Sequence, residues 1–277
     1  MKKINKLRVL AYHKVENADQ FEKQIIYLKN KYHILNMQEF ERYREDHGLY
    51  KNPLLLTFDD GDISMYQNAL PILKNYNVHA IIFVVSELID TKIPFWWDEI
   101  KYYLGEVEGE KKVWEVKKWH NKDRVNWLKD LRLNSDKVPF ETEQLSTAQL
   151  KEMSLNGLSI ANHSHTHPIY DKCTIQELQF ECEHSINMLL KNDFYPFVFA
   201  YPNGDFSEES EAILKSKCFT SVFLFNHNIN SGLLNPLRIS RLIVNDSTTI
   251  SKLKFILSGY HSRILPIIKL LFRIIKK

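Results

Sequence analysis

Short apolar runs alternate with longer amphipathic stretches along most of the chain. Runs with the length of buried strands occupy residues 9–12, 54–58, 80–85, 159–162, 197–201, 221–225 and 239–244. Stretches with helical periodicity occupy residues 19–31, 63–76, 174–192 and 207–217. Strands that alternate with helices are typical of a parallel sheet with crossover helices. The pattern therefore predicts an α/β fold.

Two polar segments directly follow predicted strands. Asp59 and Asp60 come after the run at 54–58, and three histidines lie within residues 163–167. Successive side chains of an extended segment point to opposite sides, so one aspartate can bind a metal ion while the other faces a substrate. One carboxylate and two histidines supply the three protein ligands of a hydrolytic zinc site, whose remaining position holds water. The second carboxylate can accept the proton of that water.

Each segment also has a plain structural interpretation. Asp-Asp-Gly after a strand is common turn chemistry, and a single histidine usually serves packing. Three histidines within five positions, followed by Pro168, are hard to explain by packing. The coincidence of the two segments favours a metal-assisted hydrolase.

Four segments together resemble a known family. Thr57-Phe-Asp-Asp-Gly61 and His163-Ser-His-Thr-His167 resemble the first two motifs of the polysaccharide deacetylases (NodB-homology domain, carbohydrate esterase family four). Phe199-Ala-Tyr-Pro-Asn-Gly-Asp205 is similar to the third motif. Val9-Leu-Ala-Tyr-His-Lys-Val15 is similar to the opening of many bacterial exopolysaccharide deacetylases, including the poly-N-acetylglucosamine deacetylases. The resemblance covers roughly residues 8–245 and implies a distorted (β/α)7 barrel, with residues 1–263 as the catalytic domain.

The resemblance also implies roles for individual residues. Asp59 would be the catalytic base, and His165 falls at a variable position of the second motif. The implied metal ligands are Asp60, His163 and His167. The implied oxyanion and substrate loop consists of Tyr201, Pro202 and Asn203. We expect one divalent metal ion, zinc first, with cobalt, nickel, iron or manganese as alternatives.

The chain departs from the family pattern at two positions, and other residues would have to take over the roles of the missing ones. The late histidine that supplies the general acid has no match, and His227 lacks a strand context. His13 is the better candidate, because the circularly permuted poly-N-acetylglucosamine deacetylases take this acid from an N-terminal histidine. The alternative is that His13 merely caps its strand.

The second departure is Ala200, which stands where the third motif usually carries arginine. Arg238 and Arg241 lie in the late predicted strand, on opposite faces because they are three apart. We favour Arg241 as the residue that orients Asp59 and keeps it ionised. A surface salt bridge is the alternative for this arginine.

Residues 94–150 interrupt the alternation of strands and helices. They contain all five tryptophans and many charged residues, and we expect a mostly helical insertion there. Trp96 and Trp97 follow a predicted strand closely and are candidates to line a substrate cleft. The tryptophans that we expect to form a small core within the insertion are Trp114, Trp119 and Trp127.

The two ends of the chain bear on its location. The only apolar stretch near the N-terminus is shorter than the core of a signal peptide, so we expect a cytoplasmic protein. Residues 264–277 combine apolar residues with cations only, and they are too short and too charged to span a bilayer. They are expected either to lie on an anionic membrane surface or to close the bottom of the barrel. The formal net charge of +3 is too balanced to favour a nucleic-acid partner.

The expected function is hydrolysis of an N-acetyl group on an amino sugar. The expected substrate is a surface polysaccharide or its lipid-linked or nucleotide-linked precursor. Two alternatives remain open: a hydrolase of another amide or ester, because fold and metal do not fix the substrate, and a degenerate member that binds glycan without turnover.

Overall fold

The computed structural model describes residues 5–264, in which seven strands form one parallel sheet in the order β7-β6-β5-β4-β3-β1-β8. A short additional strand, β2, pairs with β3. The strands are β1 (Arg8–Tyr12), β2 (His33–Ile34), β3 (Pro53–Phe58), β4 (Ala80–Val84), β5 (Leu158–Asn162), β6 (Val198–Ala200), β7 (Ser221–Phe223) and β8 (Leu242–Ile243). Each of the seven strands in this order overlaps one of the predicted runs, whereas β2 is not predicted.

The two edges of the sheet are joined by the segment that leads into β8. Ile239 forms a parallel bridge with Phe223, and its N–H donates to the carbonyl of Val222 at 2.9 Å. A few residues later, Leu242 and Ile243 pair with β1. The sheet therefore curls round with an irregular last strand, and the predicted distorted barrel is confirmed.

The strands are buried on both faces, as is usual for parallel sheets. Leu55, Phe83 and Phe223 come from three strands and belong to one core cluster. Leu54 and Leu56 belong to a second cluster, which includes residues of the covering helices. Successive side chains on a strand thus reach different cores, and the strand ends form a well-packed base for the polar residues that follow them.

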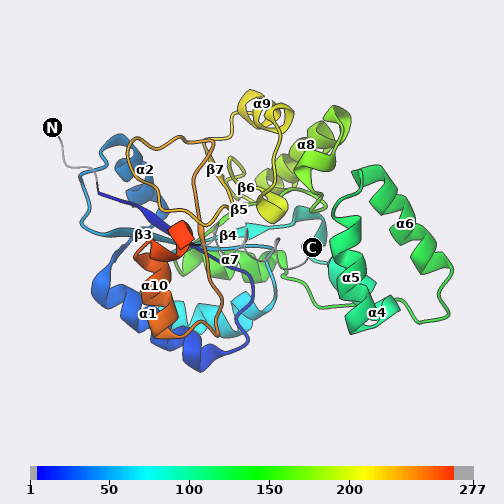
Figure 1. Cartoon of the computed structure of the whole chain (residues 1–277), viewed down its shortest axis with the longest axis horizontal. Helices are drawn as coiled ribbons and strands as arrows, with labels where there is room; N and C mark the ends of the chain where they lie inside the picture. The colour runs from blue at the N-terminus through cyan, green and yellow to red at the C-terminus, as the bar shows by residue number, and fades with distance from the viewer. Residues whose placement is uncertain (1–4, 265–277) are drawn as a thin grey trace.

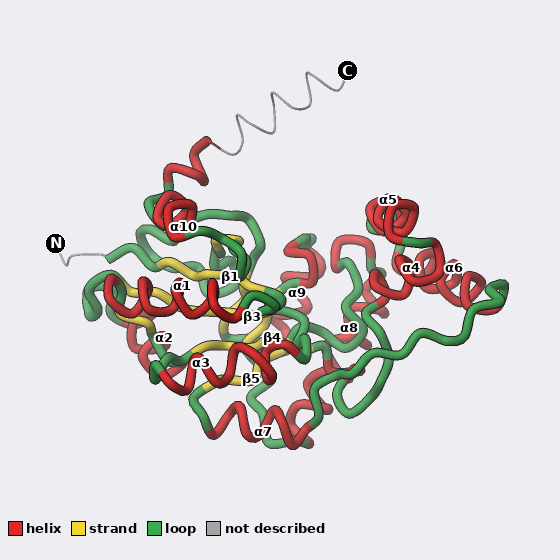
Figure 2. The backbone as a smooth tube through the Cα atoms, turned by 90° about the horizontal axis from the view of Figure 1, so that it is seen from below, coloured by secondary structure: helices red, strands yellow, loops and turns green. Residues whose placement is uncertain are grey.

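Helices cover the outside of the sheet and also form a separate lobe. The helices are α1 (Ala18–Lys31), α2 (Met37–Glu45), α3 (Leu70–Asn75), α4 (Trp96–Leu104), α5 (Glu106–Val116), α6 (Asn121–Leu133), α7 (Thr147–Leu155), α8 (Ile175–Lys191), α9 (Glu208–Ser216) and α10 (Ile250–Leu257). A π-helical turn, Met65–Ala69, leads into α3. In Figures 1 and 2, α4, α5 and α6 lie together at one side of the molecule, beyond the strands. These three helices are the predicted insertion.

Some elements differ from the expectation. The pattern does not predict α2, which is short and buries only Phe40 and Tyr43. It also assigns the start of α7 to the insertion, whereas Leu150 and Met153 of α7 pack in the main core. Between residues 5 and 264 no helix has the length and apolar character needed to cross a bilayer. The expected basic segment 264–277 lies, except for Ile264, outside the described residues.

Candidate active site

The two aspartates after β3 sit in a sharp turn of the backbone. Asp60 and Gly61 both have positive φ angles, 71° and 76°. A Cβ atom at Gly61 would lie 3.0 Å from a side-chain methyl of Val84 on the neighbouring strand. Glycine meets both demands of this turn, the left-handed φ and the close approach. The turn directs Asp59 and Asp60 to different partners.

Asp60 faces two histidines. Its Oδ1 atom lies 3.3 Å from Nε2 of His163 and 3.3 Å from Nε2 of His167. Burial by itself would raise the pKa of Asp60, but the two histidines beside the carboxylate outweigh burial and hold this pKa well below its usual range. The ligand atoms of these three residues all lie within 4.8 Å of one another, so the group could hold a metal ion.

The protonation of His163 supports this interpretation. Its Nδ1 lies 2.8 Å from the carbonyl oxygen of Ala200, which can only accept, so Nδ1 carries the proton. With the proton on Nδ1, a neutral ring would present an Nε2 lone pair to the Asp60 carboxylate, and two acceptors would then face each other. Asp60 Oδ1 is also buried without a hydrogen-bond partner among the described residues. A cation between these atoms would satisfy all of them, and a backbone carbonyl on the far nitrogen is the usual support of a metal-binding histidine.

His167 is held in its neutral form. Burial lowers the pKa of His167 to about 4, against the opposing influence of Asp60. The neutral imidazole is the form that binds metals. The backbone of His167 has a φ angle of 56°, in the left-handed region that non-glycine residues rarely adopt. The donor set of one carboxylate and two imidazoles thus fits a divalent metal ion.

Buried polar residues hold the loop that carries these histidines. Glu181 on α8 accepts hydrogen bonds from the N–H groups of His165 and Thr166, both at 2.8 Å, and from the Thr166 hydroxyl at 2.6 Å. Asn162 accepts from the N–H of Ser164 at 2.8 Å. Glu181 cannot be identified from the sequence, because its helix lies outside the motifs and only the fold brings it to the loop.

Asp59 faces a different partner, Arg241. The guanidinium donates from Nη1 to Oδ1 at 2.5 Å and from Nη2 to Oδ2 at 2.8 Å. Burial by itself would raise the pKa of Asp59, but the charge of Arg241 outweighs it and lowers this pKa below its ordinary value. Asp59 is therefore an oriented carboxylate anion. Arg238, the other arginine considered, is exposed and pairs with Glu211 instead.

These groups line one cavity of about 350 Å³. Its lining residues are His13, Asp59, Asp60, Trp97, Lys101, Glu110, Val113, Trp114, Lys117, His163, His167, Asn203 and Phe225. His13 follows β1, and its ring packs edge-to-face on Phe225 with centroids 5.4 Å apart. The cavity brings the predicted base, acid and metal ligands together from the ends of three strands, β1, β3 and β5.

The loop after β6 contributes unequally to this cavity. Asn203 lines it, with a positive φ of 59°. The side chain of Tyr201 instead packs in a core cluster with residues of α8 and α9. Pro202 is buried. Of the three residues in the predicted oxyanion loop, Asn203 is the one whose side chain faces the site.

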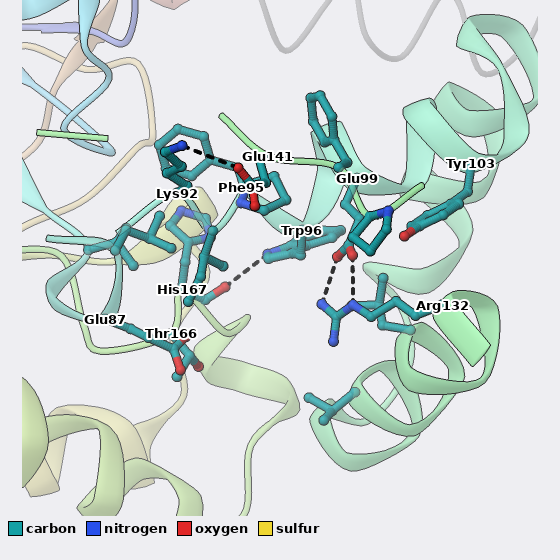
Figure 3. Close-up of a pocket in the computed structure, with 18 of the residues that line it drawn as sticks. Glu87, Lys92, Phe95, Trp96, Glu99, Tyr103, Arg132, Glu141, Thr166 and His167 are labelled. Carbon is teal, nitrogen blue, oxygen red and sulfur yellow. Dashed lines mark hydrogen bonds and ion pairs between the residues drawn. The ribbon is translucent and has the colours of Figure 1, made fainter. Parts of the chain in front are cut away.

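The tryptophans are distributed differently from the expectation. Trp97 lines the cavity, where it stacks on Phe95. It also contacts the His167 ring edge-to-face, with ring centroids 4.7 Å apart. Trp96 instead lines a neighbouring pocket of about 760 Å³, and its indole N–H donates to the His167 carbonyl (Figure 3). Trp119 and Trp127 pack within the insertion as predicted. The prediction for Trp114 is wrong, because this side chain is 59% exposed and lines the active cavity.

The neighbouring pocket lies between the insertion and the main domain. Its walls are held by the Glu99–Arg132 pair, with two contacts of 2.6 Å, and by the exposed Lys92–Glu141 pair (Figure 3). His167 borders both this pocket and the active cavity. The loop of residues 163–167 therefore touches the insertion through Trp96.

Comparison with known sequences gives three findings. The sequence model of the family described as "Polysaccharide deacetylase" matches residues 48–222. "Putative polysaccharide deacetylase YxkH" of Bacillus subtilis (strain 168) is 25% identical over 216 residues, which are 74% of this chain and 59% of YxkH. "Poly-beta-1,6-N-acetyl-D-glucosamine N-deacetylase" of Staphylococcus aureus (strain N315) is 38% identical over 71 residues, 25% of this chain and 24% of that protein. The chain thus spans less than two thirds of these relatives.

Two solved structures have a similar fold. The deacetylase PplD of Streptococcus pyogenes, in complex with acetate, superimposes with a TM-score of 0.69 and 20% identity, covering 92% of this chain and 99% of PplD. IcaB from Ammonifex degensii superimposes with a TM-score of 0.66 and 21% identity, covering 92% of this chain and 97% of IcaB. The likeness extends over nearly the whole chain and includes the barrel that carries the cavity.

Proposed function

The chain belongs to the polysaccharide deacetylase family, and from this premise we propose that it is a metal-dependent hydrolase that removes an N-acetyl group from an amino sugar. One observation carries the proposal. A single cavity holds a three-residue metal-ligand group, an ionised aspartate beside it and a histidine from a different strand end. These are the parts that amide hydrolysis needs: an activated water, a base for its proton and an acid for the departing nitrogen.

The metal ion would be held by Asp60, His163 and His167. When bound, a divalent ion supplies Lewis acidity and makes a water molecule a better nucleophile near neutral pH. Zinc fits a set of one carboxylate and two imidazoles, and cobalt, nickel, iron and manganese accept the same donors. The carbonyl of Ala200 would keep the His163 ring in the tautomer that offers Nε2.

Asp59 would take the proton of the attacking water. Arg241 keeps this carboxylate ionised and fixes its plane through two hydrogen bonds. A base that is already charged and oriented needs little reorganisation before it acts. His13, which lines the same cavity, would donate a proton to the nitrogen of the sugar as the bond between this nitrogen and the acetyl carbon breaks. The backbone N–H at Asn203 would stabilise the developing oxyanion.

The substrate class comes from the relatives. The S. aureus protein is named for N-deacetylation of poly-β-1,6-N-acetyl-D-glucosamine. We extend this chemistry to the present chain as deacetylation of a surface polysaccharide or its precursor. The product would carry free amines and become cationic.

Acetate release tests the proposal. Zinc-loaded protein is incubated with N-acetylated oligosaccharides, and both acetate and new primary amines are quantified, with metal-stripped protein as the control. Equal amounts of acetate and amine, dependent on the metal, are expected. Amide or ester hydrolysis restricted to other substrates, or glycan binding without acetate release, would replace this function by one of the two alternatives.

A further inference from the structure

Helix α5 of the insertion supplies one wall of the active cavity. Glu110, Val113, Trp114 and Lys117 all line it. Their spacing of three and four residues places them on one face of the helix. The insertion is therefore part of the site and lines it together with the motif loops.

Trp114 is exposed at the edge of this cavity, yet it is held in place. Its indole N–H donates to Glu110 at 2.9 Å, and Glu110 in turn pairs with Lys101 at 2.7 Å. The ammonium of Lys117 lies 4.9 Å from the centroid of the indole ring. A large aromatic surface that is fixed before binding loses little conformational freedom when a ligand covers it. Such a ring is suited to recognition.

Lys117 also fastens the helix to the barrel. Its Nζ atom donates to Oδ1 of Asn203, in the loop after β6, at 2.9 Å. Lys117 therefore connects the ring of Trp114 to the loop that borders the reacting centre.

We propose that Trp114 is a stacking platform for the sugar next to the one that reacts, and that Lys117 is the residue that positions it. The inference rests on the proposed deacetylase function. Asp59 is 2% exposed and Trp114 is 59% exposed, so a sugar that reaches Asp59 leaves its neighbour near the mouth of the cavity. The C–H groups on one face of a pyranose match the electron-rich face of an indole. The substrate class is then a chain of two or more sugars rather than a single sugar.

The test compares substrates of increasing length. KM and kcat are measured with zinc-loaded protein on N-acetylglucosamine oligomers of one to five units. In the unmodified protein, KM should fall when the second unit is added. Trp114→Ala should raise the KM of oligomers of two or more units about tenfold, whereas Trp114→Phe should keep most of the wild-type decrease in KM. Lys117→Met should raise the KM of the longer oligomers more than it lowers kcat, because it releases the platform.

Val107→Ala is the matched control, since Val107 lies on the same helix and is 69% exposed. Melting curves identify any variant that fails to fold, and if Trp114→Ala is among them, Lys117→Met is compared with Val107→Ala instead. Oligomer affinity is also measured by calorimetry in the Asp59→Asn background, which needs no turnover. A Trp114→Ala protein with an unchanged length dependence and affinity overturns the inference and leaves the deacetylase function standing. Absence of acetate release together with a tenfold loss of affinity overturns the function and supports the platform.

Discussion

Arg241 and Asp59 form a two-contact ion pair between positions 182 residues apart in the chain. Both side chains are almost completely buried, with exposures of 0% and 3%. Arg241 also donates from Nε to the carbonyl of Leu224, the residue after β7, at 2.8 Å, and this second contact also fixes the direction of the guanidinium. The chain thus supplies, from the residue just before its last strand, the cation that the third motif lacks at Ala200.

The first prediction concerns the stability of this pair. Arg241→Gln leaves the Asp59 charge buried without its partner, and loss of one member of a buried pair typically costs about 3–5 kcal/mol. We expect a lower denaturant midpoint in urea unfolding followed by circular dichroism. Arg238→Gln is the control on the same segment, because its pair with Glu211 is exposed. Equal midpoints for the two variants would contradict the structural importance of Arg241.

The second prediction concerns the metal ligands. His163→Ala should reduce bound metal from about one ion per chain to a small fraction. The substitution removes one of the three ligands, the histidine whose Nδ1 is held by the carbonyl of Ala200. His165→Ala should retain the metal, since His165 Nδ1 contacts the Ser86 hydroxyl rather than Asp60. The metal content of both purified proteins is measured by elemental analysis. Equal metal contents would show that His163 is not a metal ligand.

The third prediction separates the base from the ligands. Asp59→Asn should keep the metal but reduce turnover by about 10²–10⁴, the usual contribution of general acid–base catalysis. The variant should also be less stable than the unmodified protein, because Arg241 loses its counter-charge. Activity is therefore expressed per folded, metal-loaded molecule. Near-normal acetate release on that scale would leave Asp59 with a structural role only.

The fourth prediction tests the general acid. His13→Gln should lower kcat by about 10²–10⁴ with little change in metal content, because His13 lines the cavity without belonging to the ligand group. His227→Gln is the comparison, since His227 accepts a hydrogen bond from the N–H of Ile243 and contacts His261. A larger kcat loss for His227→Gln than for His13→Gln would reverse the assignment.

The fifth prediction concerns the support of the metal-binding loop. Glu181→Ala removes three hydrogen bonds to residues 165–166. Loss of such outer partners commonly weakens metal binding about 10–100-fold, which a competition titration with a zinc chelator measures. Glu183→Ala, on the exposed face of the same helix, should match the unmodified protein. Similar affinities for the two variants would show that the loop keeps its shape without Glu181.

Local sequence was sufficient for the elements and for the centre of the site. The runs at 54–58 and 159–162 are apolar and have strand length, so β3 and β5 could be predicted, as could the polar residues that end them. Parallel strands end at the same edge of a sheet, which places Asp60 near the histidines without further information. Shorter elements such as α2 could not be predicted, because few of their residues are buried and their apolar pattern is weak.

Only the tertiary structure decided which distant residues complete the site. Barrel closure through Ile239 and β8 brings Arg241, rather than Arg238, to Asp59. Packing of the insertion turns Trp114 toward the cavity and Trp96 away from it. The sequence by itself determined the strand–helix order and the motif chemistry, because both depend on the neighbours of each residue along the chain. It could not determine these long-range partners, because they depend on how the sheet curls and on where a separate group of helices comes to rest.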